Sequence, residues 1–207
     1  MPLVKEIHIK KGLLLLWEIT EKPDQLQKHY PVLTSDKRYK AFKHKKRQIE
    51  WLAIRLMLIH IGFENVNIRY NDHGQPYITH PHYKHISISH SDTLAGIILH
   101  EEVKVGLDIE SFDRNFIQVE RKYLSPVELE MTQQEEKWHC LFWCAKEAVF
   151  KTAGQPGIHF TDQIAINSIN PGSINAKLKT NKHEKSYRLN YFEYQRHFIV
   201  YAIDRKY

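Results

Sequence analysis

The sequence predicts an α+β protein built from two similar halves, because a helix followed by several strands occurs twice along its 207 residues. Hydrophobic residues form 42% of the chain and charged residues 26%, a balance typical of a globular protein rather than a disordered one. We find no matching residues between the halves, so their similarity rests on element order alone. A junction near residues 101–104 gives predicted halves of residues 1–102 and 103–207.

The first half is predicted to begin with a buried strand over Leu13–Ile19. A long helical pattern follows over Asp36–Ile61, with Thr34 or Ser35 as its N-cap and Gly62 as its stop signal. Short strands come next, and a tight turn separates the first two of them. These elements are predicted at Val66–Tyr70, Asn71–Gly74 for the turn, Pro76–Thr79, His85–Ser89 and Leu94–His100.

The second half repeats this order, starting with a helix near Gln134–Thr152 that a breaker at Gly154–Gly157 ends. Apolar side chains at three- and four-residue spacing give this helix a wide face for the core. They are Trp138, Leu141, Phe142, Ala145, Ala148, Val149 and Thr152. Strands are then predicted near Gln163–Asn167, Ile174–Lys179, Ser186–Glu193 and Phe198–Ile203.

Two acidic residues share one face of a strand just after the predicted junction. Side chains alternate along a strand, so the apolar residues at positions 103, 105, 107 and 109 fall on one face and leave Asp108 and Glu110 together on the other. Exposed acids on an alternating strand are common, which is the ordinary alternative to a chemical role.

A third acidic residue and a lysine lie together on the helix of the second half. Glu147 and Lys151 are four residues apart, on the roughly opposite side from the core face, in one stripe with Cys140 and Cys144. Three carboxylates, completed by water and phosphate oxygens, suit a hard cation such as Mg²⁺, and a lysine one turn onward suits a phosphate. The alternative for the Glu–Lys pair is a surface salt bridge.

Charge and cysteine content narrow the classes of function. The net charge of +6 and the pI near 9.1 favour a polyanionic partner, although the basic segment Lys37–Arg55 also fits a solvated helix face. The two cysteines are expected to be free thiols, and a zinc site lacks a second ligand pair. The longest apolar run, Leu13–Trp17, is too short for a membrane span and no leader precedes it, so we expect a cytoplasmic protein that binds no membrane.

Four segments, in this order, resemble the 4′-phosphopantetheinyl transferases, specifically the larger single-chain class called Sfp-type. A fifth segment between the last two, Tyr123–Glu128, is similar to the family's aromatic-x-Ser-x-x-Glu motif. The pair Gly-x-Asp-x-Glu and Trp-x-x-Lys-Glu-x-x-x-Lys is the most specific part of the resemblance. The four segments are Gly74-Gln75-Pro76, Ile86–Ser91, Gly106–Glu110 and Trp143–Lys151.

The resemblance implies a fold of two α+β halves related by a pseudo-twofold, with coenzyme A and Mg²⁺ or Mn²⁺ in the cleft between them. It implies that Asp108, Glu110 and Glu147 hold the metal against the pyrophosphate. Lys151 would contact the same phosphates and ease departure of the leaving group. By the same resemblance, Asp108 and Lys151 also belong to the cofactor-binding residues.

The resemblance also assigns residues of the first half to coenzyme A. Arg47 and His90 would grip the 3′-phosphate, and Ser89 would sit against the adenylate portion. Gln75 stands where many relatives carry lysine, so a neutral contact is expected there. His90 would point into the core if its strand continued, whereas a turn at Ser89 would free it.

The activity implied is transfer of the phosphopantetheine arm from coenzyme A to a serine of an apo acyl or peptidyl carrier protein, releasing adenosine 3′,5′-bisphosphate. Glu147, directly or through a metal-bound water, is expected to take the serine proton. Carrier proteins are commonly acidic around that serine, which fits the basic excess of this chain. We expect a monomer, because the two halves already form a pseudo-dimer.

Two other functions use parts of the same pattern. A Mg²⁺-dependent phosphodiesterase or pyrophosphatase acting on a nucleotide would explain the three acids but not Ser89, His90 or the Gly74–Pro76 segment. A nucleic-acid-binding module is suggested by the basic segment and by 11 tyrosines, 9 phenylalanines and 4 tryptophans. Most of these aromatic residues lie in apolar stripes, so we expect core packing and no nucleic acid.

Overall fold

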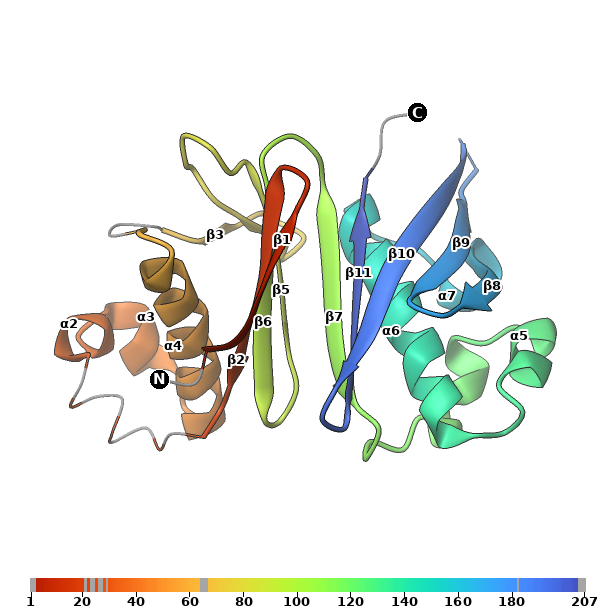
Figure 1. Ribbon diagram of the computed structural model, residues 1–207, viewed down its shortest axis with the longest axis horizontal. Helices are drawn as coiled ribbons and strands as arrows, with labels where there is room; N and C mark the ends of the chain where they lie inside the picture. Colours follow the sequence, from red (N-terminus) through yellow and green to blue (C-terminus); the bar gives the residue numbers. More distant parts are fainter. Residues whose placement is uncertain are drawn as a thin grey trace.

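The structure is a computed structural model that describes residues 3–20, 22, 25, 28, 30–63, 67–181 and 183–204. Within them lie two larger antiparallel sheets and one short hairpin, with the longest helix of each half on the outer face of a larger sheet (Figure 1). This arrangement is the mixed α+β fold that the sequence predicts. Among the described residues, no helix combines the length and apolarity needed to cross a membrane.

The first larger sheet has the strand order β1-β2-β6-β5, and a small hairpin, β3-β4, lies beyond it. Helix α4 covers one face of this sheet. The elements are β1 (Leu3–Ile9), β2 (Gly12–Glu18), α2 (Pro31–Thr34), α3 (Lys37–Ala41), α4 (Lys45–His60), β3 (Arg69–Tyr70), β4 (Pro76–Tyr77), β5 (His85–His90) and β6 (Leu94–His100).

The second larger sheet has the order β7-β11-β10-β9-β8, and helix α6 packs against it. Its elements are β7 (Val105–Ser111), a 3₁₀ helix (Ile117–Lys122), α5 (Pro126–Met131), α6 (Glu136–Ala153), α7 (Phe160–Gln163), β8 (Ile164–Asn170), β9 (Ser173–Lys179), β10 (Glu184–Tyr194) and β11 (His197–Ile203). Neither larger sheet uses a strand from the other side of residues 101–104. The boundary between residues 102 and 103 and the pseudo-twofold stay predictions.

The long first helix is wrong as predicted, because the chain forms two helices with a break at residues 42–44. Asp36, not Thr34 or Ser35, is the N-cap of α3, where its carboxylate accepts the Arg38 N–H at 2.7 Å. Phe42 then turns extended, packs against the core, and its carbonyl accepts from the Gln48 side chain. The helix therefore ends at Phe42, because burial of its ring is favoured over a further helical turn.

Other boundaries follow the sequence closely. Gly62 follows the end of α4 with φ +85°, and Gly154 caps α6 with φ +66°, so both stop signals are confirmed. Strand β6 has the predicted limits. Of the strand predicted at Val66–Tyr70, Val66 lies outside the described residues and β3 keeps two residues. Strand β1 was not predicted.

The central strands β2, β6, β7 and β11 are buried on both faces, whereas β1, β8, β9 and β10 keep exposed positions. Along β2, Leu13, Leu15 and Trp17 pack toward α4, whereas Leu14 and Leu16 join a cluster shared by both sheets. Strand β7 contributes Val105, Leu107 and Ile109 to the shared cluster. The predicted alternation of β7 is confirmed, although residue 103 precedes the strand.

Strands β5 and β7 meet along a seam in which serine side chains replace backbone acceptors. The Ser87 hydroxyl accepts the Leu107 N–H at 3.0 Å, and the Ser89 hydroxyl accepts the Ile109 N–H at 3.1 Å. Both steps advance by two residues, so the strands run in the same direction. This seam brings the end of β5 beside the acidic face of β7.

Candidate active site

Helix α6 lies unusually close to β7 at Gly106. A Cβ atom at this position would lie 2.1 Å from the Ala148 carbonyl oxygen and 2.3 Å from the Thr152 hydroxyl oxygen. Only glycine leaves room for this approach. It places the last turns of α6 directly against Asp108, two residues further along β7.

Asp108, Lys151 and Ser89 form one buried polar cluster. The Lys151 ammonium lies 2.8 Å from Asp108 Oδ1, 2.9 Å from the Leu107 carbonyl oxygen and 3.2 Å from Ser89 Oγ. Ser89 Oγ donates to the same Asp108 oxygen at 3.0 Å. Burial lowers the pKa of Lys151, but the Asp108 carboxylate outweighs it, so the pKa is raised and the amine stays charged.

Glu110 is held by two donors at the solvent end of β7. Its Oε1 atom accepts from Arg114 at 2.5 Å and from the Trp143 indole at 3.2 Å. Burial and the Asp108 charge raise the pKa of Glu110, although Arg114 and Trp143 oppose this rise. Arg114 and Trp143 were not predicted, because nothing in their spacing marks them as partners of Glu110.

Glu147 has the most perturbed carboxylate of the three predicted metal ligands. Burial and the Asp108 charge raise its pKa to about 7, Lys151 opposes the rise and Glu110 adds to it. The mutual shifts show that the acids of β7 and α6 share one electrostatic environment. A cation would offset the negative charge of Asp108 and Glu110 that adds to the effect of burial on Glu147.

The residues fit a divalent cation by charge and donor type. Asp108 Oδ2 is buried without a hydrogen-bond partner in the described part of the chain, and oxygen donors suit Mg²⁺. Among the described residues, however, no three His, Cys, Asp or Glu side chains are placed to hold a metal ion. Lys151 and Arg114 pair with Asp108 and Glu110 instead. The three-carboxylate metal set therefore stays a prediction.

Arg47 and His90 come together at the start of α4 and the end of β5. Arg47 Nη1 lies 3.0 Å from His90 Nε2 and 2.9 Å from the buried Glu50 carboxylate. Of the two alternatives left open at Ser89, the structure has the continued strand, because β5 extends through His90. The imidazole stays out of the apolar core because β5 ends beside the charged first turns of α4.

Two hollows meet at Arg47 and His90. The larger, of about 850 Å³, is bordered also by Lys46, Glu110 and Arg114. The smaller, of about 580 Å³, is bordered also by Gln75, Lys151 and the exposed rings of Tyr70 and Tyr77. The hollows therefore bring Arg47, Gln75, His90, Glu110 and Lys151 to accessible walls, as a binding site requires.

Ser89, Asp108 and Glu147 do not border these hollows. The Ser89 side chain faces β7 and is only 6% exposed, so the predicted contact of this side chain with an adenylate is not the geometry found. Its hydroxyl instead orients Asp108 and Lys151. Asp108 is buried beside Lys151, and Glu147 is half-buried on α6.

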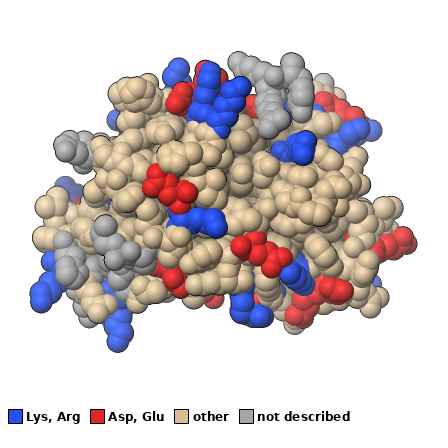
Figure 2. Space-filling view, viewed as in Figure 1, with Lys and Arg blue, Asp and Glu red and all other residues tan. Residues whose placement is uncertain are grey.

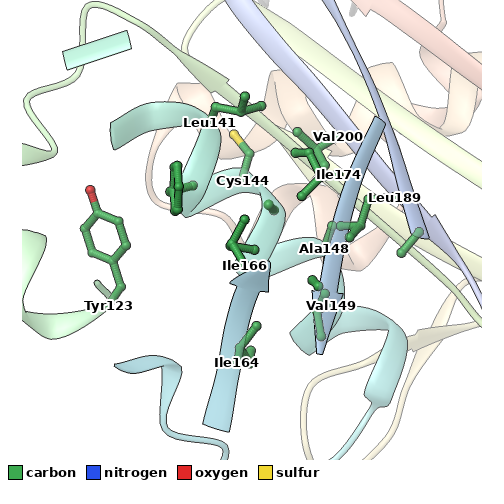
Figure 3. Packing of buried hydrophobic residues seen from close by; sticks show 14 of the residues in the cluster. Tyr123, Leu141, Cys144, Ala148, Val149, Ile164, Ile166, Ile174, Leu189 and Val200 are labelled. Carbon is green, nitrogen blue, oxygen red and sulfur yellow. The ribbon is translucent and has the colours of Figure 1, made fainter. Parts of the chain in front are cut away.

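The stripe of Cys140 and Cys144 faces β7 rather than solvent. Both thiols are free and fully buried, and Cys140 Sγ lies 3.8 Å from the Glu110 carbonyl oxygen. Figure 3 shows Cys144 and Ala148 of α6 packed among strand residues of the second sheet such as Ile166. The predicted position of the cysteine stripe, opposite the core, was wrong. Helix α6 is buried both on its predicted core face and on the face that carries the two cysteines.

An ion pair that the sequence did not reveal fixes α6. Lys146 Nζ lies 2.7 Å from Glu128 Oε2 and 3.0 Å from the Phe160 carbonyl oxygen, and the Lys146 side chain has no exposed surface. Glu128 also accepts the N–H groups of Ser125 and Ile166. The Ser-x-x-Glu spacing is a readable capping-box signal, and the structure confirms such a box at α5.

Part of the chain matches the model of a known protein family. Residues 104–202 match the family of the 4′-phosphopantetheinyl transferase superfamily. This segment holds β7 and α6, with Asp108, Glu110, Glu147 and Lys151. The match covers just under half of the chain and indicates that this segment is similar to phosphopantetheinyl transferase-type enzymes.

The match does not include the candidate site residues of the first half, which all precede residue 104. These residues are Arg47, Gln75, Ser89 and His90. A separate comparison with curated proteins found no match to the chain.

Proposed function

We propose that the protein is an Sfp-type 4′-phosphopantetheinyl transferase that modifies a serine of an apo acyl or peptidyl carrier protein and requires Mg²⁺. The single observation that carries the proposal is the Asp108–Lys151 cluster behind two hollows that meet at Arg47 and His90. A carboxylate group, a lysine and an anion-binding pair are thus available to one extended substrate. Such a site suits phosphoryl transfer, which depends on positioning and charge stabilisation.

In the proposed reaction, the carrier serine oxygen bonds to the phosphorus that bears the pantetheine arm. The bond from that phosphorus to the bridging oxygen breaks, and adenosine 3′,5′-bisphosphate leaves with the electron pair. Lys151 stabilises the charge that develops on the leaving phosphate. Lys151 borders the smaller hollow, and its ammonium is held beside Asp108, 2.8 Å away.

Glu147 is the proposed acceptor of the serine proton. A pKa of about 7 lets this carboxylate accept a proton at neutral pH, as efficient general bases do. Asp108, Glu110 and Glu147 are the residues that would hold Mg²⁺ or Mn²⁺. When bound, such an ion would neutralise charge on the pyrophosphate of coenzyme A.

Several finer points belong to the same proposal. Gln75 would offer a neutral contact at the wall of the smaller hollow, next to Lys151 and the end of α6. The halves 1–102 and 103–207 would act as one monomer in the cytoplasm. Figure 2 shows basic and acidic side chains interspersed over the face it draws, so attraction of an acidic carrier would rest on the net charge of +6.

The decisive experiment incubates the protein with coenzyme A, Mg²⁺ and a panel of unmodified carrier proteins, and measures the intact mass of each carrier. We expect one added phosphopantetheine arm, lost when a chelator removes the metal. Release of adenosine 3′,5′-bisphosphate without any carrier would instead favour the nucleotide phosphodiesterase or pyrophosphatase.

Glu147→Gln tests the role of the base. This variant should lose transfer while still binding coenzyme A, because the amide cannot accept the serine proton. Glu136→Gln, an exposed change on the same helix, is the matched control and should transfer normally. Normal turnover in Glu147→Gln would refute the assignment.

A further inference from the structure

A buried carboxylate lies behind the two cationic side chains that join the hollows. Glu50 is 3% exposed, and its Oε2 atom lies 2.9 Å from Arg47 Nη1. Its Oε1 atom lies 3.3 Å from His90 Nδ1. Arg47 and His90 contact each other at 3.0 Å, so the three groups form a closed triangle.

The triangle has an inner acidic corner and an outer cationic edge. The side chains of Arg47 and His90 are 57% and 32% exposed, whereas the Glu50 side chain is 4% exposed. A ligand in the smaller hollow therefore meets the cations and not the carboxylate, and in the larger hollow, which Glu50 also borders, the two cations are far more exposed than the carboxylate. Burying a carboxylate costs free energy that its partners must offset, so its position here calls for a role.

The surroundings of the triangle favour an anion of high charge. Helix α4 begins at Lys45 without a side-chain cap, so its partial positive end lies near Arg47. Lys46 borders the larger hollow and Lys151 the smaller. A phosphate monoester, with up to two charges and several acceptor oxygens, matches this setting better than a singly charged diester.

We infer that Glu50 is a positioning residue that orients Arg47 and His90 toward a phosphate monoester on the nucleotide end of the ligand. The inference rests on the proposed function, in which that group is the 3′-phosphate of coenzyme A. In this role Glu50 acts through its two neighbours. Its Oε2 atom accepts a hydrogen bond from the Arg47 guanidinium, and its Oε1 atom faces the His90 imidazole at 3.3 Å without a hydrogen bond to any described residue.

Electrostatics around His90 agree with this role. Burial lowers the pKa of His90, Glu50 raises it, and Arg47, Lys151 and Lys46 lower it further. Glu50 is thus the group that opposes three neighbouring cations. Without it, the imidazole would stay neutral more often and offer less charge to a phosphate.

The test compares ligands that differ by one phosphate monoester. Calorimetry measures the Kd of adenosine 3′,5′-bisphosphate and of adenosine 5′-monophosphate for the wild type and for Glu50→Gln. We expect about tenfold weaker binding of the bisphosphate in the variant, because charge-assisted hydrogen bonds lose their orientation. The monophosphate should change by less than about twofold.

Steady-state kinetics give a second readout that a purely structural role would not move. In Glu50→Gln, the KM for coenzyme A should rise while kcat and the KM for 3′-dephospho-coenzyme A stay nearly constant. Glu120→Gln is the matched control, because Glu120 lies 3.0 Å from His139 Nε2 and neither residue borders the two hollows. It should leave ligand discrimination unchanged.

Unchanged or tighter binding of the bisphosphate by Glu50→Gln would overturn the inference. Should that variant not fold, NMR of the wild type decides: the His90 ring must become protonated when the bisphosphate binds, and an unaffected ring overturns the inference. If the protein distinguishes the bisphosphate from the monophosphate but transfers no phosphopantetheine arm, only the proposed function is overturned.

Discussion

Lys146 is predicted to hold the fold of the site rather than to take part in the chemistry. It belongs to the Trp-x-x-Lys-Glu segment directly before Glu147, yet its ammonium pairs with Glu128 away from both hollows. Burial lowers the pKa of Lys146, and the Glu128 carboxylate opposes this. Lys146→Met would keep the length of the side chain and remove its charge.

The expected cost follows from what the change leaves behind. Glu128 would remain 2% exposed with only the Ser125 and Ile166 N–H groups as partners, and the Phe160 carbonyl would lose its donor. Removing one partner of a buried ion pair costs about 3–5 kcal/mol. For a chain of this size, that loss corresponds to a fall in Tm of roughly 6–20 °C.

Urea unfolding and the transfer assay, run together, separate stability from chemistry. Lys146→Met/Glu128→Gln should recover part of the loss, because the amide removes the unpaired charge and its one oxygen still accepts one of the two N–H groups. Lys137→Met is the control on the same helix, since its pair with Glu193 is exposed and should contribute less than about 1 kcal/mol. The reasoning is refuted if Lys146→Met abolishes transfer but changes the unfolding free energy by less than about 1 kcal/mol.

Three further changes test the contacts that build the site. Gly106→Ala should cost about 3 kcal/mol in urea unfolding because its Cβ meets α6, whereas Gly157→Ala, with open space around it, should cost about 1 kcal/mol. Ser89→Ala should lower transfer more than Ser87→Ala, because only Ser89 also contacts Asp108 and Lys151. Since the pKa of Glu147 is about 7, Mg²⁺ binding with coenzyme A present should tighten from pH 6 to pH 8 as its proton leaves.

Each of these predictions has an outcome that contradicts it. Equal stability of the two glycine variants would show that α6 can move away from β7 at no cost. Equal transfer by the two serine variants would remove Ser89 from the site. Calorimetry that finds the same Mg²⁺ affinity at both pH values, or the same pH dependence in Glu147→Gln, would show that Glu147 is not the titrating ligand.

The sequence predicted the elements that local patterns define. Alternation along β7 predicted that Asp108 and Glu110 share one face, and helical spacing predicted that Glu147 and Lys151 lie one turn apart; of these residues, Asp108 and Lys151 are in contact. Glycines at positions 62 and 154 ended the helices as predicted. Such signals lie within a few residues of each other and need no knowledge of the rest of the chain.

Contacts between distant segments were beyond the sequence. Nothing near Phe42 marks a helix break, because the break depends on burial of its ring against the first sheet. Arg55 was counted in a solvated basic segment, but it is buried with its guanidinium 3.4 Å from the Trp51 ring centre. The Lys146–Glu128 pair joins residues 18 positions apart, and only the packing of α5 against α6 brings them together.

The serine-bridged seam between β5 and β7 decides how residues 104–202 would behave if produced alone. The N–H groups of Leu107 and Ile109 would lose Ser87 and Ser89, and the face of β7 that carries Val105 would lose its cover of leucine side chains. A bare, apolar strand edge is a template for pairing with another chain. The fragment would therefore associate with itself, and the first half acts as a built-in cap that keeps β7 from doing so.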